Sequence, residues 1–202
     1  GAVYSAAMRV DRVAEPGAEW DEFVEAMPGG TLAHASGWAA VVREAYRLEP
    51  RYLAARDGRG GLVGVLPLVR FRSLLGAREL VSMPFLDTGG ILAREAEAEI
   101  ALREAALAEA RAWRARAVEL RQAAPLLAGP AAPAGDRVDL VLPLPSDEES
   151  LWKGLSAKVR NQTRKASREG LALAEEGAGD LVSRFYAPFT ANMRDLGSPV
   201  HG

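Results

Sequence analysis

The pattern of hydrophobic and polar positions in the first 50 residues predicts one strand and two helices. Apolar residues alternate with charged ones over 8–14, which indicates a strand. Apolar residues at i, i+3, i+4 and i+7 predict a helix over 19–27, which ends at the Pro-Gly-Gly of 28–30. Ser36 is expected to cap a second helix that runs to Tyr46. The predicted apolar stripes consist of Trp20, Phe23, Val24 and Met27 in the first helix, and of Trp38, Val41, Val42 and Ala45 in the second.

Strand signals dominate the next segment. Residues 52–56 and 62–72 are rich in apolar and β-branched residues and flank an Asp-Gly-Arg-Gly-Gly turn, which predicts a hairpin. Pro67 in the second strand has no N–H to donate, so it is expected at an edge or a bulge. A further strand over 79–84 is predicted to lead into a loop that ends at Gly90.

The rest of the chain alternates helices with short strands. A helix is predicted over 94–116, then a strand over 117–121, a loop over 122–135 and a strand over 137–142. Ser146, with Glu149 three residues later, has the spacing of a capping box. Further predicted elements are a basic helix over 156–169, a strand over 171–175, and a helix over 180–196 with Leu181, Phe185, Phe189 and Met193 on one face. This order predicts an α/β (α+β) fold with a mixed sheet flanked by helices.

Composition narrows the class of protein. The 202 residues are 49% hydrophobic and 26% charged, with a formal net charge of −2, which excludes a protein that coats nucleic acid. There is no cysteine and there are only two histidines, so thiolate chemistry is excluded and a metal centre is disfavoured. Neither a signal peptide nor an apolar run long enough to span a bilayer is visible, so we expect a cytoplasmic protein without stable membrane insertion.

The strongest local signal is a basic segment over 158–168. It holds five positive and no negative charges in eleven residues. On a helix, Arg160, Arg164 and Arg168 repeat at i, i+4 and i+8. Like charges at that spacing repel one another unless a bound anion neutralises them. Such a ridge suits a phosphate or diphosphate. The alternative is a solvated face neutralised by acidic neighbours, namely Glu148, Glu149, Glu175 and Glu176.

A second candidate is the loop over 83–90. Its double glycine allows a close approach of ligand to backbone, and Asp87 could accept a hydrogen bond from a substrate amine. The alternative is a structural turn that Asp87 caps. Trp38 and Tyr46 could line a groove or belong to the core, and His34 could be a cap residue or a base. Walker and strand-linked G-x-G-x-x-G motifs are missing, and Ser36 lacks a G-x-S-x-G setting, so these enzyme classes are disfavoured.

Several segments of the sequence occur in an order that is typical of a known protein family. They are 38–46, 64–68, 83–90, Leu151-Trp152, 158–166, and the run from Phe185 to Val200 that contains Asn192-Met193-Arg194-Asp195-Leu196-Gly197-Ser198-Pro199. Together they resemble the FemAB family of peptidoglycan-bridge aminoacyltransferases, especially the branch associated with exosortase (PEP-CTERM) and exopolysaccharide systems. The resemblance spans nearly the whole chain.

This resemblance implies a fold and a set of roles. Family members contain two tandem domains of the GNAT acyltransferase fold, so we expect a first GNAT-like domain over 1–145, and over 146–202 linker helices with the start of a truncated second domain. By the same resemblance, Lys158, Arg160 and Arg164 would bind an anionic, nucleotide-linked or glycan precursor. Trp38, Tyr46 and the loop around Asp87 would face the same groove.

The implied reaction is attack by a substrate amine on an activated acyl ester or thioester, with Asp87 orienting or deprotonating the amine. No tightly bound cofactor is expected; acyl-CoA or aminoacyl-tRNA would be the co-substrate. The R/Q-x-x-G-x-G/A loop of acetyl-CoA enzymes is missing from the sequence. Two alternatives are a coenzyme-A-dependent GNAT-type acyltransferase and a non-catalytic module that binds an anionic glycan or nucleotide. A homodimer through the last helix is a further expectation.

Overall fold

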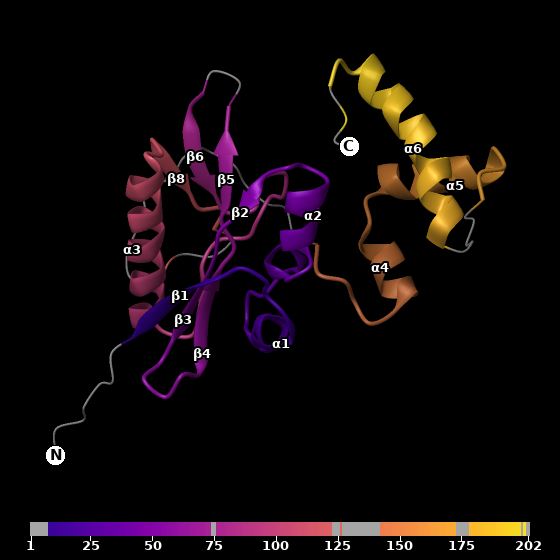
Figure 1. Cartoon of the computed structure of the whole chain (residues 1–202). Helices are drawn as coiled ribbons and strands as arrows, with labels where there is room; N and C mark the ends of the chain where they lie inside the picture. The colour runs from indigo at the N-terminus through magenta and orange to yellow at the C-terminus, as the bar shows by residue number, and fades with distance from the viewer. Residues whose placement is uncertain are drawn as a thin grey trace. The chain divides into compact units, whose positions relative to one another are not determined.

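The chain divides into two units, residues 1–132 and 133–202 (Figure 1). The computed structural model describes residues 8–73, 76–122, 126, 142–172, 178–198 and 200. The first unit contains two four-stranded sheets and three α-helices among its described residues, and the second contains three α-helices. This confirms a mixed α/β architecture in which helices flank sheets.

The two sheets of the first unit have the strand orders β1-β3-β4-β7 and β2-β5-β6-β8. All pairs are antiparallel except β6 with β8, which are parallel and joined through α3. The strands are β1 (Arg9–Val13), β2 (Glu49–Pro50), β3 (Tyr52–Arg56), β4 (Leu62–Leu66), β5 (Val69–Arg72), β6 (Arg78–Val81), β7 (Leu92–Ala93) and β8 (Ala117–Glu119). The helices are α1 (Ala18–Ala26), the 3₁₀ turn η1 (Leu32–His34), α2 (Trp38–Glu44) and α3 (Ala96–Trp113).

A single hairpin runs through both sheets. One arm passes from β2 to β3 through Arg51, and the other passes from β4 to β5 through Pro67 and Leu68. The Arg51 N–H donates to the Leu68 carbonyl at 2.6 Å, so the two arms stay paired where they change sheet. Pro67 was expected at an edge or a bulge within one strand over 62–72. It lies instead at the break between two strands, where its missing N–H costs no ladder hydrogen bond.

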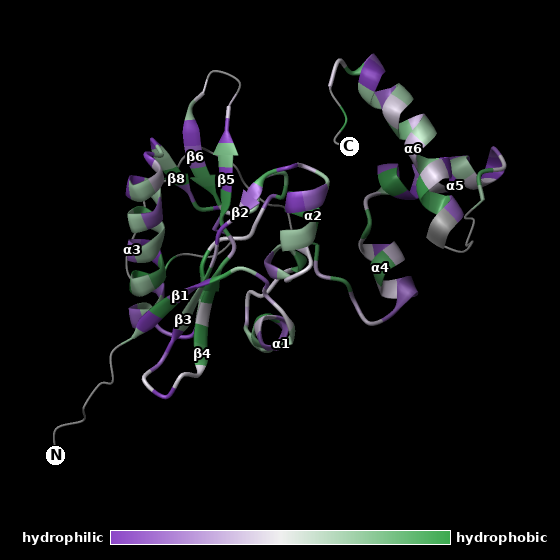
Figure 2. Cartoon of the chain, in the orientation of Figure 1, coloured by the Kyte–Doolittle hydropathy of each residue, from purple (hydrophilic) through white to green (hydrophobic). Residues whose placement is uncertain are grey.

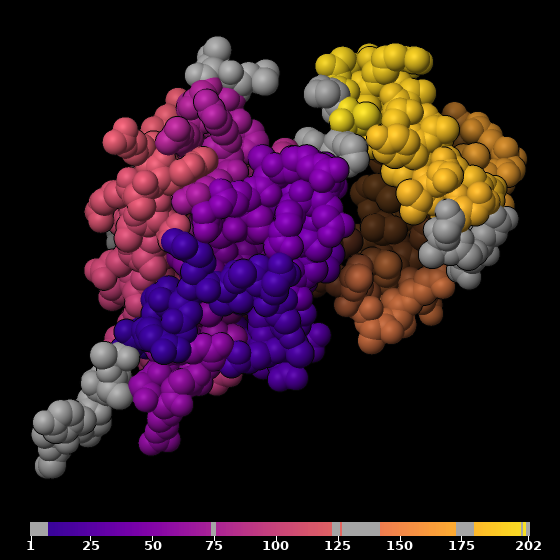
Figure 3. Space-filling model, viewed as in Figure 1, coloured from indigo at the N-terminus to yellow at the C-terminus, as the bar shows by residue number. Residues whose placement is uncertain are grey.

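The central strand β3 is buried on both faces because α3 covers one side and α1 and α2 cover the other (Figure 1). Alternate residues of β3 point to opposite sides, as the twofold strand period requires. Tyr52 and Ala54 pack with α1 and α2, whereas Leu53 and Ala55 pack with α3. Figure 2 shows β4 as mostly hydrophobic and the turn that leads into it as hydrophilic, and Figure 3 shows this turn projecting from the body of the first unit. The first unit therefore has two cores, one on each side of its strands.

A chain of alternating charges fixes the C-terminal half of α3 to the strands. Glu109 of α3 pairs with Arg12 and lies 3.8 Å from Arg70, and Glu49 bridges Arg70 and Arg51. The Arg70 guanidinium also lies over the Trp113 ring, 5.0 Å from its centroid. These charges lie beside the apolar packing of the same half of α3, where Ala106 and Ala110 are buried.

The second unit contains α4 (Glu148–Gly154), α5 (Ala157–Arg168) and α6 (Ala178–Asp195). None of its described residues is buried. Exposed apolar side chains include Val182, Phe185 and Tyr186 on α6, where the Phe185 and Phe189 rings stack at 5.3 Å. Over the described residues of the whole chain, no helix combines the length and the apolar character that a bilayer crossing requires.

Two predicted caps are wrong. Ser36 does not cap α2, because the Asp21 carboxylate accepts both the Ser36 N–H (2.8 Å) and the Ser36 hydroxyl (2.6 Å), and Gly37 occupies the cap position. The cap of α4 is Asp147 rather than Ser146, since the Asp147 carboxylate accepts the Ser150 N–H at 2.8 Å. At α4 a carboxylate, which is the stronger acceptor, takes the role expected of a serine, whereas α2 has no side-chain cap.

Several other sequence-based predictions of strands and of the domain boundary differ from the structure or lie outside its described residues. All but the last residue of the predicted strand over 137–142 and most of the strand over 171–175 lie outside the described residues; residues 142, 171 and 172 are described and are not in a strand. The domain boundary expected between residues 145 and 146 falls inside the second unit, and the assignment of 1–145 and 146–202 as GNAT-like domains stays a prediction. The short strands β2 and β7, which lie in different sheets and have two residues each, were not predicted because strands of this length carry no periodic signal.

Candidate functional site

The predicted basic helix forms as α5. The Ser156 hydroxyl accepts the Val159 N–H at 3.4 Å and caps its first turn, and Gly170, with φ +81°, follows its end. This left-handed residue is the usual way to end a helix. The helix therefore presents Lys158, Arg160, Arg164 and Arg168 as predicted, all on the second unit.

The contacts of these cations differ. Arg160 is half-buried, and its Nη1 donates to the carbonyl oxygens of Leu155 and, at 3.3 Å, Lys153. These carbonyls end α4, so Arg160 stabilises the turn between the two helices. Its role as an anion ligand stays a prediction, but part of its donor capacity is already used.

Arg164 and Lys158 are exposed. The Arg164 guanidinium lies over the Trp152 ring at 5.4 Å from the centroid, a cation–π contact that limits the orientations of the side chain. Lys158 forms no ion pair with any residue that the structure describes. Of the three cations predicted to bind an anion, Lys158 and Arg164 therefore have more freedom than Arg160 to meet a ligand.

The alternative of a neutralised face applies only in part. Lys165 pairs with Glu169 at 3.5 Å, whereas Glu149 pairs with Lys153 of its own helix at 2.6 Å. Glu175 and Glu176 lie outside the described residues. An open hollow beside α4 is lined, among described residues, by Glu148, Glu149 and Trp152. Its carboxylates do not suit an anion, so the face of α5 is the better candidate.

The loop over 83–90 belongs to the first unit. Asp87 in it is exposed. Gly89 and Gly90 are buried, and a Cβ on Gly89 would lie 2.8 Å from the Met83 side chain. A Cβ on Gly90 would lie 2.1 Å from the Gln122 side-chain oxygen. Close internal packing therefore explains the double glycine without a ligand.

Gln122 and Arg121 hold this loop in place. The Gln122 side chain accepts the Ile91 N–H and donates to the Ile91 carbonyl, both at 2.8 Å. The Arg121 guanidinium donates to the carbonyls of Leu86 and Met83 and pairs with Glu119 at 2.9 Å. Sequence patterns do not indicate these loop contacts, because the loop residues that Gln122 and Arg121 bind are more than thirty residues away.

Trp38 and Tyr46 lie near opposite ends of α2 and are both half-buried. The Trp38 indole N–H donates to the Leu32 carbonyl at 2.9 Å, which fixes the ring. The Tyr46 ring stacks on Phe85 at 4.3 Å. The structure thus brings Tyr46 to the loop that contains Asp87. Of the apolar face predicted for α2, Val42 is buried, but Val41 is 41% exposed because the helix turns Ala39 and Val42 toward the core.

His34 is a structural residue. Its Nδ1 accepts the Thr31 N–H at 3.3 Å and lies 3.0 Å from the Thr31 hydroxyl, and its Nε2 donates to the Gly90 carbonyl at 3.2 Å. These partners assign the proton to Nε2. Both ring nitrogens are engaged, so the ring closes the cap of η1 instead of acting as a base.

The His34 contacts predict a pH dependence of stability. Burial lowers the pKa of the His34 imidazole below its usual 6.5, and the bond to Gly90 offsets this only in part. The unfolded chain therefore takes up a proton near pH 6.5 that the folded chain resists, and stability is full above that pH and falls below it. Urea unfolding at pH 7.5 and 5.5 should show a lower midpoint at the lower pH. In His34→Gln the midpoint should change less over this interval; an equal change would contradict the assignment.

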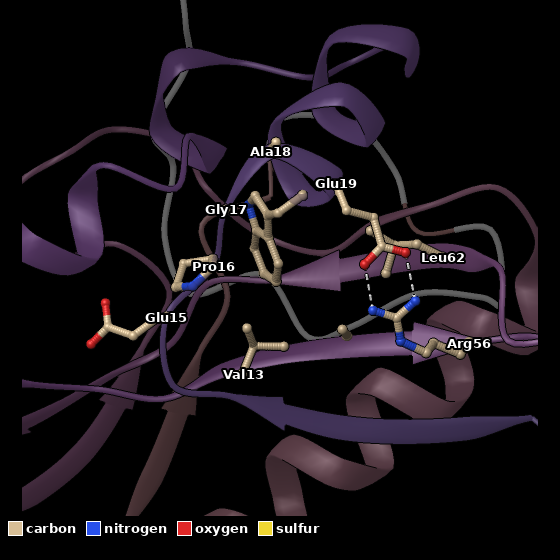
Figure 4. A pocket seen from close by; sticks show the side chains of 10 residues that line it. Val13, Glu15, Pro16, Gly17, Ala18, Glu19, Arg56 and Leu62 are labelled. Carbon is tan, nitrogen blue, oxygen red and sulfur yellow. Dashed lines mark hydrogen bonds and ion pairs between the residues drawn. The ribbon is translucent and has the colours of Figure 1, made fainter.

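A small pocket of about 190 Å³ lies at the N-terminal end of α1 (Figure 4). Its wall is largely apolar and includes Val13, Pro16 and Leu62. Arg56 lies at one end and donates to both oxygens of Glu19, at 2.7 and 2.6 Å, and to the Gly60 carbonyl at 3.0 Å. This bidentate bond lowers the pKa of Glu19. Because the guanidinium is already paired, the pocket is a poor anion site, and it contains none of the predicted site residues.

The predicted site residues therefore fall into two groups, each within one unit: Trp38, Tyr46 and Asp87 in the first, and Lys158, Arg160 and Arg164 in the second. Sequence reasoning missed Phe85 and Trp152 as the aromatic partners of Tyr46 and Arg164. Among the described residues, no group of three or more carboxylates and histidines could hold a metal ion. Comparison of the chain with family models, curated proteins and solved structures finds no match in any of the three.

Proposed function

We propose that this chain is part of an acyl or aminoacyl transferase that acts on an amine of a cell-envelope or exopolysaccharide precursor. The proposal rests on the resemblance to the FemAB family and on the exposed cations Lys158 and Arg164 of α5. In it, Lys158 and Arg164 hold the anionic part of a nucleotide-linked or glycan precursor, with Arg160 behind them.

The observation that carries the proposal is that Lys158 and Arg164 are exposed and form no ion pair with a carboxylate among the described residues. Lys158 is exposed with no ion pair among the described residues, and Arg164 lies over Trp152 instead of pairing with a carboxylate. Arg160, Arg164 and Arg168 stand at intervals of four residues, where like charges repel, and this costs the helix stability that a bound phosphate would restore. A guanidinium held over an indole and an ammonium on the same helix offer a fork and a point charge, the two kinds of donor that bind phosphates.

The proposed reaction forms an amide bond. The lone pair of the amine attacks the acyl carbon of an ester or thioester, and the C–O or C–S bond breaks. The amine gives up a proton, and the leaving alkoxide or thiolate takes one up. Asp87 is proposed to orient the amine, since an exposed carboxylate can accept its N–H. The two sheets flanked by helices, one antiparallel and one with a parallel pair, support a GNAT-like fold as part of this proposal.

A binding titration tests the proposed phosphate contact. A nucleotide-sugar such as UDP-N-acetylglucosamine, coenzyme A and bulk tRNA are each titrated against the whole chain and against Lys158→Ala and Arg164→Ala. Each variant is expected to bind the cognate ligand about tenfold more weakly, the loss of one charge-assisted hydrogen bond. The ligand that shows this loss identifies the class: coenzyme A would favour the coenzyme-A-dependent acyltransferase, and tRNA an aminoacyl donor.

Lys165→Ala is the matched control. It removes the same charge from the same helix, but this lysine is paired with Glu169, so its loss should leave binding unchanged. Equal affinities for all three variants and the wild-type chain would show that α5 is a solvated face and would overturn the proposal. Binding that depends on Lys158 without transfer to any amine would favour a non-catalytic binding module.

A further inference from the structure

The stacked pair Tyr46 and Phe85 forms an aromatic ledge on the first unit. The two rings are nearly parallel, 18° apart, with centroids at 4.3 Å. Phe71 of β5 meets Phe85 edge-on at 6.5 Å, so Phe85 has aromatic partners on two sides. Phe85 is nevertheless 39% exposed, and Tyr46 is half-buried. An aromatic surface that is both ordered and open to solvent is thus present at this point.

The backbone at this ledge is unusually costly. Among the residues that the structure describes, four non-glycine residues have positive φ, and three of them lie in or next to the stack: Arg47 follows Tyr46, and Met83 and Phe85 belong to the loop itself. Phe85, with φ +73°, is a bulky residue in a conformation that favours glycine. Strain of this kind persists only where the surrounding structure enforces it, and it concentrates at functional sites.

The surrounding structure does enforce it. Arg121 donates to the carbonyls of Met83 and Leu86, on either side of Phe85. The Met83 side chain is fully buried, and its sulfur accepts the Tyr52 hydroxyl at 3.5 Å. These contacts fix the backbone on both sides of Phe85. They do not require a phenyl ring at position 85, where glycine would adopt the same φ without cost.

We infer that Tyr46 and Phe85 form a platform that binds the flat face of a ligand ring and positions it beside Asp87. The inference rests on the proposed function, and it names Phe85 as a residue that recognises the precursor through its ring. Both a nucleobase and a pyranose present such a face, and both pack on aromatic side chains. Rigid support lowers the ordering cost of binding, which gives the strained backbone a purpose.

Two phosphate-free probes test the platform independently of α5: uridine supplies a base, and methyl N-acetyl-β-glucosaminide supplies a pyranose. Saturation-transfer NMR on the whole chain is expected to show transfer to the ring protons of one of them, which identifies the source of the ring. Phe85→Gly keeps the backbone conformation and removes the phenyl ring. We expect it to bind that probe about tenfold more weakly, with a Tm within a few degrees of the wild-type value.

Arg114→Gly is the matched control, because Arg114 also has positive φ, +55°, but caps the end of α3. It should leave probe binding unchanged. If Phe85→Gly does not fold, Phe85→Leu keeps apolar bulk without a flat face and should show the same loss. Equal binding by the Phe85 variants, or transfer to neither probe in the wild-type chain, would overturn the inference. Loss of nucleotide-sugar binding in Lys158→Ala is a separate result, so the two proposals can fail independently.

Discussion

Replacing Trp20 by alanine is expected to lower the free energy of unfolding by about 3–5 kcal/mol, the usual cost of deleting a buried large aromatic residue. Trp20 is 3% exposed and lies in the core between α1 and the strands. Its ring stacks on Tyr52 with centroids at 5.2 Å, and its indole N–H donates to the His34 carbonyl at 2.6 Å. The substitution therefore opens a cavity and leaves a buried carbonyl without its donor. Urea unfolding followed by far-UV circular dichroism measures the loss.

Trp20→Phe separates these two contributions. It keeps a ring beside Tyr52 but removes the donor to His34, so the expected loss is the smaller value of about 1–3 kcal/mol for an orphaned buried acceptor. A loss below about 1 kcal/mol in Trp20→Ala would show that the core beside α1 rearranges freely and would contradict the packing described for it.

Gly30→Ala is expected to destabilise the first unit by about 3 kcal/mol, the upper end of the range for overpacking. A Cβ at this position would lie 2.0 Å from the Val24 carbonyl oxygen and 3.1 Å from that of Met27. Both are backbone atoms at the end of α1, so no side chain can move aside to make room. The turn must open, which breaks the bond from the Gly30 N–H to the Met27 carbonyl. The shift in the thermal unfolding midpoint measures the effect.

Gly37→Ala provides the comparison. Gly37 has ordinary helical dihedral angles, and a Cβ there meets no atom within 4 Å. Removing a glycine from such a position restricts the unfolded chain and is neutral or stabilising by up to about 1 kcal/mol. Similar midpoints for the Gly30 and Gly37 variants would mean that the space around residue 30 is less confined than the structure describes.

Periodicity was enough to predict the elements that carry a core. The stripe of Trp20, Phe23 and Val24 is buried as expected, and the hairpin around 57–61 and the long helix α3 occur near their predicted bounds. Strand and helix periods report which side of an element is buried, and that information is local. The break at Pro67 was harder to place, because a switch from one sheet to another depends on what lies opposite.

Candidate site residues could be chosen from the sequence, but their partners could not. The cationic ridge of α5 follows from its spacing, yet nothing in that spacing shows that Arg160 would bind the carbonyls of α4 or that Arg164 would meet Trp152. Likewise, the double glycine at 89–90 suggested an approach for a ligand, whereas Met83 and Gln122 fill the space. Contacts between distant residues decide these roles, and a single sequence does not encode them in any periodic form.

The hairpin whose arms cross from one sheet to the other has a consequence for how the first unit unfolds. The two sheets share the arms of this hairpin. One arm continues from β2 into β3, and the other continues from β4 into β5. Because Arg51 alone separates β2 from β3, separation of the strands in one sheet directly displaces a strand of the other. We therefore expect the first unit to melt as one cooperative block, with no intermediate that retains only half of its strands.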